Sequence, residues 1–116
     1  MPHHNIINTI THPILSVIMP VYNREWCLSK AIETILGQTF TDFEIIIADD
    51  NSTDSTPEII KKYSAADSRI KPLFLEKRGH LHAINRAVEI ANGNIAARVD
   101  SDDISMPRDL KNRLNI

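Results

Sequence analysis

The chain has 116 residues, of which 42% are hydrophobic and 24% charged, a composition suited to one small globular domain with a single core. The formal net charge of −2 at pH 7 gives no electrostatic basis for binding nucleic acid. A single cysteine, Cys27, excludes a disulfide within the chain and favours a reducing compartment such as the cytoplasm. No apolar run approaches the ~18 residues of a membrane span, and residues 1–7 lack the pattern of a secretory signal.

The chain begins with a polar arm followed by a strand and a helix. Residues 1–13 are polar, carry two prolines and are expected to form a flexible N-terminal arm. The apolar run 15–19 is rich in β-branched residues and predicts a buried strand. Apolar residues then recur at helical spacing over 28–36, with Asn23 as the expected N-cap and Gly37 as the end of the helix.

A second strand and helix follow. The run 43–48 predicts the strongest strand of the chain, and the turn-forming residues 49–54 predict a polar loop after it. Ser55 and Glu58 have the spacing of a capping box, and Pro57 suits the first turn of a helix. The sequence therefore predicts that this helix starts near residue 55.

The remaining elements repeat the alternation. Residues 70–75 predict a third strand, 81–91 a third helix and 95–99 a fourth strand. The fourth strand runs directly into the acidic segment Asp100-Ser101-Asp102-Asp103. A last helix is expected after Pro107.

Strands that alternate with helices predict βαβ crossovers, a parallel sheet and an α/β fold, here with the strand order 3-2-1-4. Ligands of such sheets bind beyond the carboxyl ends of the strands, where polar and acidic residues gather in this sequence. The loops expected at that edge are 20–25, 49–55, 76–79 and 100–103. The order places the fourth strand at an edge of the sheet, so the strand could pair with a second copy and form a homodimer.

The acidic segment predicts a metal site. Carboxylates this close repel one another unless a cation offsets their charge, and Mg²⁺ and Mn²⁺ bind through one or two carboxylates plus substrate phosphates. Asp100 and Asp102 stand two residues apart, and on an extended segment both would face one ion. The alternative interpretation is a solvated turn in which Asp103 caps the next helix. Asp49 and Asp50 have a similar alternative, as turn formers.

Four segments in a fixed order carry a family resemblance. They are Ser16-Val17-Ile18-Met19-Pro20-Val21-Tyr22-Asn23, Gln38-Thr39-Phe40, Glu44-Ile45-Ile46-Ile47-Ala48-Asp49-Asp50-Asn51-Ser52-Thr53-Asp54, and Gly93-Asn94-Ile95 leading to Asp100-Ser101-Asp102-Asp103. Together these segments resemble the N-terminal half of the family 2 glycosyltransferases. The resemblance implies a Rossmann-like GT-A fold over residues 14–116 and a nucleotide-diphospho-sugar donor, with UDP-sugars as the default. It also implies a saccharide or lipid-linked acceptor of the cell envelope, a cytoplasmic location and association with the membrane surface.

The resemblance also implies roles for individual residues at the nucleotide. Pro20 and Tyr22 match positions that lie against the nucleobase. Asp50 matches the acid that accepts a hydrogen bond from the base, whereas Asp49 is expected to orient the loop. Arg78 lies near a position where some relatives place a basic contact to the nucleotide.

The acid-x-acid motif and the catalytic base complete the implied site. Asp100 and Asp102 match the motif that holds Mn²⁺ or Mg²⁺ and the diphosphate, with Asp102 as the direct metal ligand. The general base of inverting relatives would lie beyond Ile116, so no catalytic residue is assigned. The chain is therefore expected to be a donor-binding unit of an enzyme or, alternatively, a non-catalytic nucleotide-binding remnant. A receiver-like signalling domain is disfavoured, because the acidic residues follow the second and fourth strands.

Overall fold

The computed structural model describes residues 13–103, and four strands alternate with three helices in this part of the chain. The elements are β1 (Leu15–Val21), α2 (Leu28–Leu36), β2 (Phe43–Asp49), α3 (Thr56–Ala66), β3 (Ile70–Phe74), α4 (His80–Ile90) and β4 (Ile95–Arg98). All seven were predicted from the sequence within a few residues. The expected arm over 1–12 and the helix after Pro107 lie outside the described residues.

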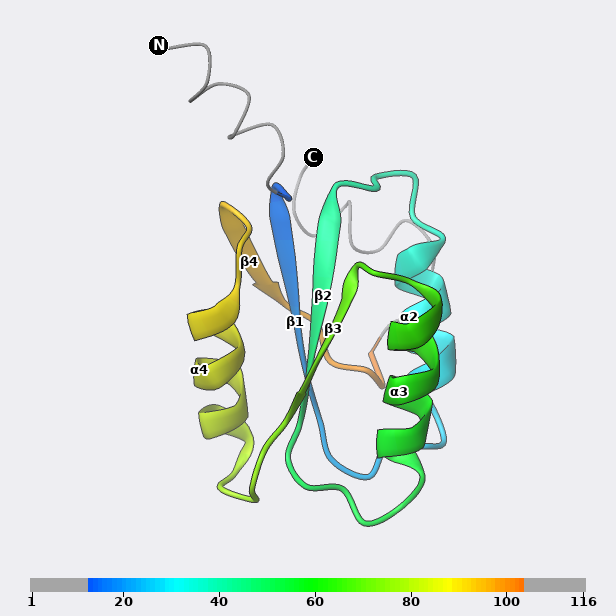
Figure 1. Ribbon diagram of the computed structural model, residues 1–116, viewed down its shortest axis with the longest axis vertical. Coiled ribbons are helices and arrows are strands. Elements are labelled where there is room, and N and C mark those ends of the chain that lie inside the picture. The colour runs from blue at the N-terminus through cyan, green and yellow to red at the C-terminus, as the bar shows by residue number, and fades with distance from the viewer. Residues whose placement is uncertain (1–12, 104–116) are drawn as a thin grey trace, which may run out of the picture.

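The strands form one parallel sheet in the order β3-β2-β1-β4 (Figure 1), which confirms the predicted 3-2-1-4 arrangement. β1 continues through Pro20 to Val21 instead of ending before the proline. The Ile18 carbonyl accepts the Val99 N–H on the β4 side of β1, and Pro20, two residues on, faces the same side. Because β4 pairs with β1 only as far as Ile18, the missing N–H of Pro20 removes no ladder hydrogen bond.

The two faces of the sheet are covered unequally (Figure 1). Helices α2 and α3 pack on one face over a large buried cluster that includes Val17, Ile32, Ile45 and Ile60. Helix α4 alone covers the other face, mainly through small residues such as Ala83 against the sheet. Alanine at the contact lets the α4 backbone approach the sheet closely, which brings the first turn of α4 beside the loops after β1 and β2.

The predicted N-caps are wrong in detail. Helix α2 begins at Leu28, and Asn23 lies upstream of it with a positive φ of 52°. The Ser55–Glu58 capping box is absent, because the Ser55 N–H donates to Glu25 Oε1 at 2.9 Å and the Ser55 side chain makes no cap hydrogen bond. Asn23 and Glu25, which precede α2, accept backbone N–H groups of the neighbouring loop, and at the start of α3 it is Asp54 whose Oδ1 accepts the Thr56 N–H at 2.9 Å.

Within the described residues β4 forms one edge of the sheet and is mostly exposed, as the strand order predicts. Dimerisation through this edge stays a prediction. Among the described helices, none has the length and apolar character that a membrane crossing requires.

Candidate functional site

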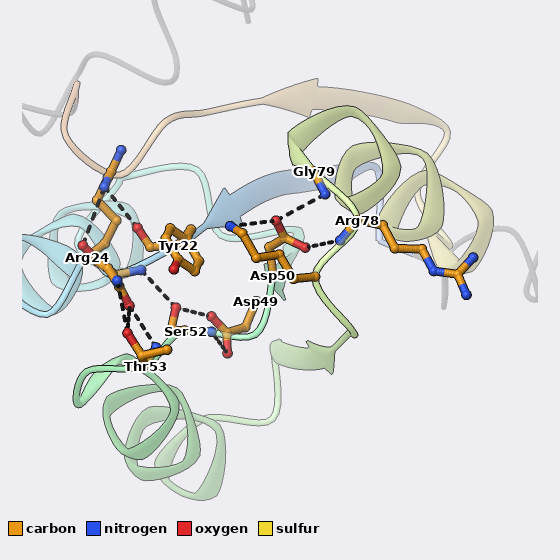
Figure 2. Close-up of polar contacts among 10 residues, drawn as sticks. Tyr22, Arg24, Asp49, Asp50, Ser52, Thr53, Arg78 and Gly79 are labelled. Carbon is orange, nitrogen blue, oxygen red and sulfur yellow. Dashed lines mark hydrogen bonds and ion pairs between the residues drawn. The ribbon is translucent and has the colours of Figure 1, made fainter.

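The loops that follow β1 and β2 are joined by hydrogen bonds at the carboxyl edge of the sheet (Figure 2). The Asn23 N–H donates to Ser52 Oγ at 2.8 Å, and Asn23 Oδ1 accepts the Thr53 N–H at 2.8 Å. The positive φ of Asn23 turns its side chain toward the second loop. The two loops are therefore held in one arrangement by hydrogen bonds across 29 or more residues of sequence.

Asp49 supports this arrangement from beneath. Its side chain is buried, and its carboxylate accepts the Ser52 N–H and the Ser52 hydroxyl (Figure 2). Burial raises the pKa of Asp49 above the ordinary value, although the hydrogen bonds from Ser52 oppose the shift. Asp49 lines neither pocket described below, and its role in orienting the loop stays a prediction.

Asp50 holds a second loop. Its side chain is only 5% exposed, and its two oxygens accept the N–H groups of Arg78 at 3.0 Å and Gly79 at 3.2 Å (Figure 2). Gly79 has a φ of +99°, a region that other residues avoid, so the chain can turn here into the start of α4. Each carboxylate oxygen has two lone pairs, so both keep capacity for a further donor.

A pocket of about 200 Å³ opens beside Asp50, and we call it the Tyr22 pocket. Its lining residues are Pro20, Val21, Tyr22, Asp50, Lys77, Gly79, His80 and Ala83. The Lys77 ammonium lies 3.5 Å from the centre of the Tyr22 ring and 3.9 Å from Asp50 Oδ2. The pocket thus combines an aromatic face, a buried anion and a cation.

Arg78 does not contribute its side chain to this pocket. Figure 2 shows its guanidinium directed away from Asp50 and Tyr22, and an exposed ion pair at 3.8 Å joins it to Glu76. Only the Arg78 backbone N–H meets the predicted site. The basic side chain in the pocket belongs to its neighbour Lys77, which the sequence analysis missed.

The acidic segment is a turn and not the extended strand that was expected. The Asp103 N–H donates to the Asp100 carbonyl at 3.1 Å, and the chain bends at Ser101 and Asp102. The argument that residues two apart face the same way therefore fails. Ser101 points inward, where its buried hydroxyl accepts a hydrogen bond from Cys27 Sγ at 3.8 Å. The turn still brings Asp100 and Asp102 to one pocket.

This second pocket, the Asp102 pocket, has a volume of about 220 Å³. Its lining residues are Pro20, Arg24, His80, Arg98, Asp100, Ser101 and Asp102. Arg98 Nε lies 3.1 Å from Asp100 Oδ1, and Arg98 Nη2 donates to His80 Nε2 at 2.5 Å. Carboxylates and cations therefore face each other across one small space.

The sequence analysis gave no role to Arg24, His80 or Arg98. Each lies next to a predicted strand end or helix start, which is the only signal the sequence offers for them. In residues 13–103 no group of three or more His, Cys, Asp and Glu side chains is arranged to hold a metal ion. Asp100 and Asp102 supply two carboxylates, and further ligands would have to come from substrate or solvent.

The Tyr22 pocket and the Asp102 pocket adjoin, because Pro20 and His80 line both. Their position beyond the carboxyl ends of β1, β2 and β4 is the usual ligand site of a parallel α/β sheet. The fold and site together define an α/β protein whose two adjoining pockets lie at the usual ligand edge of a parallel sheet.

Sequence comparison specifies the family. A model of Glycosyl transferase family 2 matches residues 16–115, and the chain belongs to this family. The chain is 38% identical over 104 residues to WfgD of Escherichia coli, named as a UDP-Glc:alpha-D-GlcNAc-diphosphoundecaprenol beta-1,3-glucosyltransferase, covering 89% of this chain and 40% of WfgD. It spans between 11% and 42% of the lengths of eight curated relatives.

Solved structures agree in fold. TarS 1–349 of S. aureus, crystallised with UDP, matches with a TM-score of 0.76 and 33% identity over 87% of this chain and 31% of that one. The mannosyltransferase PcManGT of Pyrobaculum calidifontis, solved with GDP-Man and Mn²⁺, matches with a TM-score of 0.68 and 28% identity. The match covers 78% of this chain and 28% of PcManGT. The predicted GT-A fold is confirmed.

Proposed function

We propose that the chain is the donor-binding part of a glycosyltransferase. It binds a nucleotide-diphospho-sugar together with Mn²⁺ or Mg²⁺, for transfer of the sugar to a saccharide or lipid-linked acceptor. The observation that carries the proposal is the pair of adjoining pockets at the carboxyl edge of the sheet. The UDP bound to TarS and the GDP-Man and Mn²⁺ bound to PcManGT support the donor class, and the name of WfgD supports the acceptor class.

The Tyr22 pocket suits the nucleobase. Tyr22 offers an aromatic ring and Pro20 an apolar surface, on which a planar base can stack. Asp50 offers a buried carboxylate with lone pairs to spare. Uracil is the first candidate base, since UDP-sugars are the default donors of the family.

The Asp102 pocket suits the diphosphate. Arg24, His80 and Arg98 bring donors to this pocket, and α4 begins at His80, so the positive end of its dipole faces the same space. The acidic pair Asp100 and Asp102 would repel a free diphosphate. A divalent ion between the two sets of anions removes that conflict.

The residues present fit such an ion. Mg²⁺ and Mn²⁺ need only one or two carboxylates when phosphate oxygens and water complete the coordination. Asp102 is the proposed direct ligand, because the Asp100 carboxylate is already paired with Arg98. When bound, the ion would offset the negative charge of the departing nucleoside diphosphate.

The residues of this chain bind and orient the donor. In this proposal the general base for the acceptor hydroxyl comes from beyond Ile116, within a longer protein whose domain extends from residue 14. The same proposal places the protein in the cytoplasm, at the surface of the membrane that carries a lipid-linked acceptor.

Calorimetry of the 116-residue chain with UDP tests the proposal. Binding should be clear with Mn²⁺ and weak with a chelator. Asp102→Asn should weaken the Mn²⁺-supported binding by about tenfold or more, because one oxygen ligand loses its charge. Asp103→Asn, the matched control in the same turn, should have a smaller effect. Equal losses for the two variants would mean a generic acidic turn and would refute the metal site. Binding without transfer is expected of this chain in either case, because the proposed general base is not among its residues, so transfer by a protein that also contains the base is what separates the enzyme from the non-catalytic remnant.

A further inference from the structure

Gln38 has a buried side-chain oxygen without a partner. The residue follows the end of α2 and is only 5% exposed. Its side-chain N–H donates to the Thr34 carbonyl at 3.1 Å, so the amide nitrogen, and not the oxygen, must face that carbonyl. In the part of the chain that the structure describes, Gln38 Oε1 is the one buried side-chain nitrogen or oxygen with no hydrogen-bond partner. An unpaired buried oxygen is costly, which indicates that a donor belongs beside it.

The other end of α2 lies beside the acidic turn. Val99 is buried in the cluster on which α2 and α3 pack, and the buried Ser101 hydroxyl meets Cys27 Sγ at 3.8 Å. Cys27 directly precedes α2, which spans Leu28–Leu36. The chain after β4 therefore crosses to the side of the sheet that carries α2 and α3 (Figure 1). The segment that follows Asp103 starts near the first turn of α2.

The sequence after the acidic turn suits a helix that runs along α2. Pro107 favours the first turn of a helix, and Leu110 and Leu114 stand four residues apart, on one helical face. At about 1.5 Å per residue, a helix over 107–116 would span about 15 Å, and the nine residues of α2 span about 13 Å. A helix that starts beside the first turn of α2 would therefore end near Gln38. The second half of this segment carries side-chain N–H donors, namely Lys111, Asn112, Arg113 and Asn115.

We propose that Gln38 anchors residues 107–116, which dock along α2 as a helix whose last turn donates to Gln38 Oε1. Docking fixes the chain on the C-terminal side of the acidic turn, as the pairing of β4 with β1 fixes it on the other side. Gln38 is thereby a positioning residue for Asp100 and Asp102, although it lies at the opposite end of α2. The positioning role rests on the proposed function, whereas the docking does not depend on it.

A packing role for Gln38 makes a different prediction. If its oxygen met only a water molecule, loss of the amide would change the stability of the domain and would leave residues 107–116 unaffected. An anchor instead controls the order of a segment about 70 residues away in the sequence. The order of that segment is the readout that separates the two roles.

Hydrogen exchange of the 116-residue chain, followed by mass spectrometry, measures the docking. Amides of residues 107–116 should exchange at least about tenfold more slowly in the chain than in a synthetic peptide of the same sequence. Gln38→Met keeps the length of the side chain but removes the amide, and should bring exchange close to that of the peptide. The same variant should weaken Mn²⁺ binding in the presence of UDP by about three- to tenfold. Leu114→Ser should cause both changes, and the double variant should add little, because the same docking is lost.

Ile60→Val is the control for lost stability, because Ile60 is buried in the same cluster, belongs to α3 and lines neither pocket. It should lower the free energy of unfolding and leave both readouts unchanged. Unprotected residues 107–116 in the wild type, or unchanged protection in Gln38→Met, would overturn the anchor and leave the proposed function standing. Lost protection with unchanged Mn²⁺ affinity would overturn the positioning role. A wild-type chain that binds neither Mn²⁺ nor UDP would refute the proposed function and the positioning role with it, while the exchange rates would still decide the anchor.

Discussion

The carboxylate of the Tyr22 pocket is buried and held by backbone N–H groups, whereas the carboxylates of the Asp102 pocket are partly or largely exposed to solvent. Asp50 is only 5% exposed and accepts two backbone N–H groups, but Asp102 is exposed and Asp100 pairs with the half-exposed Arg98. A preformed pocket favours selection of a ligand, since little order has to be created on binding. An open acidic turn favours exchange of an ion and release of a charged product.

The largest effect should come from Asp50→Ala, which tests whether the Tyr22 pocket is preformed. The substitution leaves the N–H groups of Arg78 and Gly79 without their acceptor, so the free energy of unfolding should fall by about 1–3 kcal/mol, and UDP affinity by a similar amount. Denaturant unfolding and calorimetry measure the two quantities. Asp49→Ala should lower stability and cost less in binding. An unchanged dissociation constant for Asp50→Ala would remove Asp50 from the nucleotide site.

Gly79→Ala should come next. A Cβ at Gly79 would meet no atom within 4 Å, so the whole cost is backbone strain at φ +99°, about 1–3 kcal/mol. Weaker UDP binding should accompany the loss of stability, because Gly79 lines the Tyr22 pocket. Gly37→Ala, at a φ of −84°, is the control and should change UDP affinity little. Normal binding by Gly79→Ala would show that the loop adapts to the ligand.

Arg98→Gln tests whether the exposed carboxylates of the Asp102 pocket are available to a metal ion. Removal of the guanidinium frees the Asp100 carboxylate, so Mn²⁺ alone should bind more tightly, by up to about fivefold for a partly exposed ion pair. UDP with Mn²⁺ should bind more weakly, because a cation near the diphosphate is lost. Arg86→Gln, whose exposed partner is Glu89, is the control and should change neither. Two changes of the same sign would refute this prediction.

A smaller effect is expected for self-association of the chain through β4. The exposed edge predicts dimerisation at micromolar or higher concentration, measured by sedimentation. Ala96→Lys places a charge on an exposed position of β4 and should shift the chain toward the monomer. A wild-type chain that stays monomeric at every concentration would contradict the prediction.

The smallest effect concerns pH. Burial raises the pKa of Asp49, so the folded state binds more protons than the unfolded state just above the ordinary Asp value. The free energy of unfolding should therefore fall as pH rises through this window, and Asp49→Asn should remove that fall. Asp67→Asn is the control with the opposite sign. Hydrogen bonds from Arg69 lower the pKa of Asp67, so the stability that Asp67 contributes is lost as pH falls. Parallel curves for wild type and Asp49→Asn would rule out the shift.

The sequence predicts the fold well because hydrophobic periodicity and strand–helix alternation are local signals. It also predicts that Pro20, Tyr22, Asp50, Asp100 and Asp102 lie at one edge, because the carboxyl ends of parallel strands share an edge. Side-chain direction is not local. The sequence cannot show that Arg78 points away while Lys77 turns inward, since that choice depends on how Asp50 holds their backbone.

The predictions of the helix N-caps were wrong for a related reason. Asn23 and Ser55 have good capping residue types, but the neighbouring loop offers each a competing partner across about 30 residues of sequence. Propensity describes a residue and its own helix, and here tertiary hydrogen bonds outweigh it.

Contacts at the amino-terminal ends of the strands, opposite the two pockets, help to fix the position of the acidic turn. There the buried Glu44 carboxylate accepts from the Ser16 hydroxyl and the Asn92 N–H, and the Gly93 N–H donates to the same hydroxyl at 2.8 Å. A Cβ on Gly93 would come within 2.7 Å of the Ser16 backbone nitrogen, so the chain can pass here only as glycine.

These hydrogen bonds lie just before β4 begins and help to fix the register of this four-residue strand against β1. A slip of one residue would exchange the two faces of β4 and carry the turn with it, so the inward Ser101 would lose its place to a carboxylate. Glu44, Asn92 and Gly93 therefore help to set the position of Asp100 and Asp102, the proposed metal ligands. A change at these residues is expected to alter metal affinity while leaving every side chain of both pockets chemically intact.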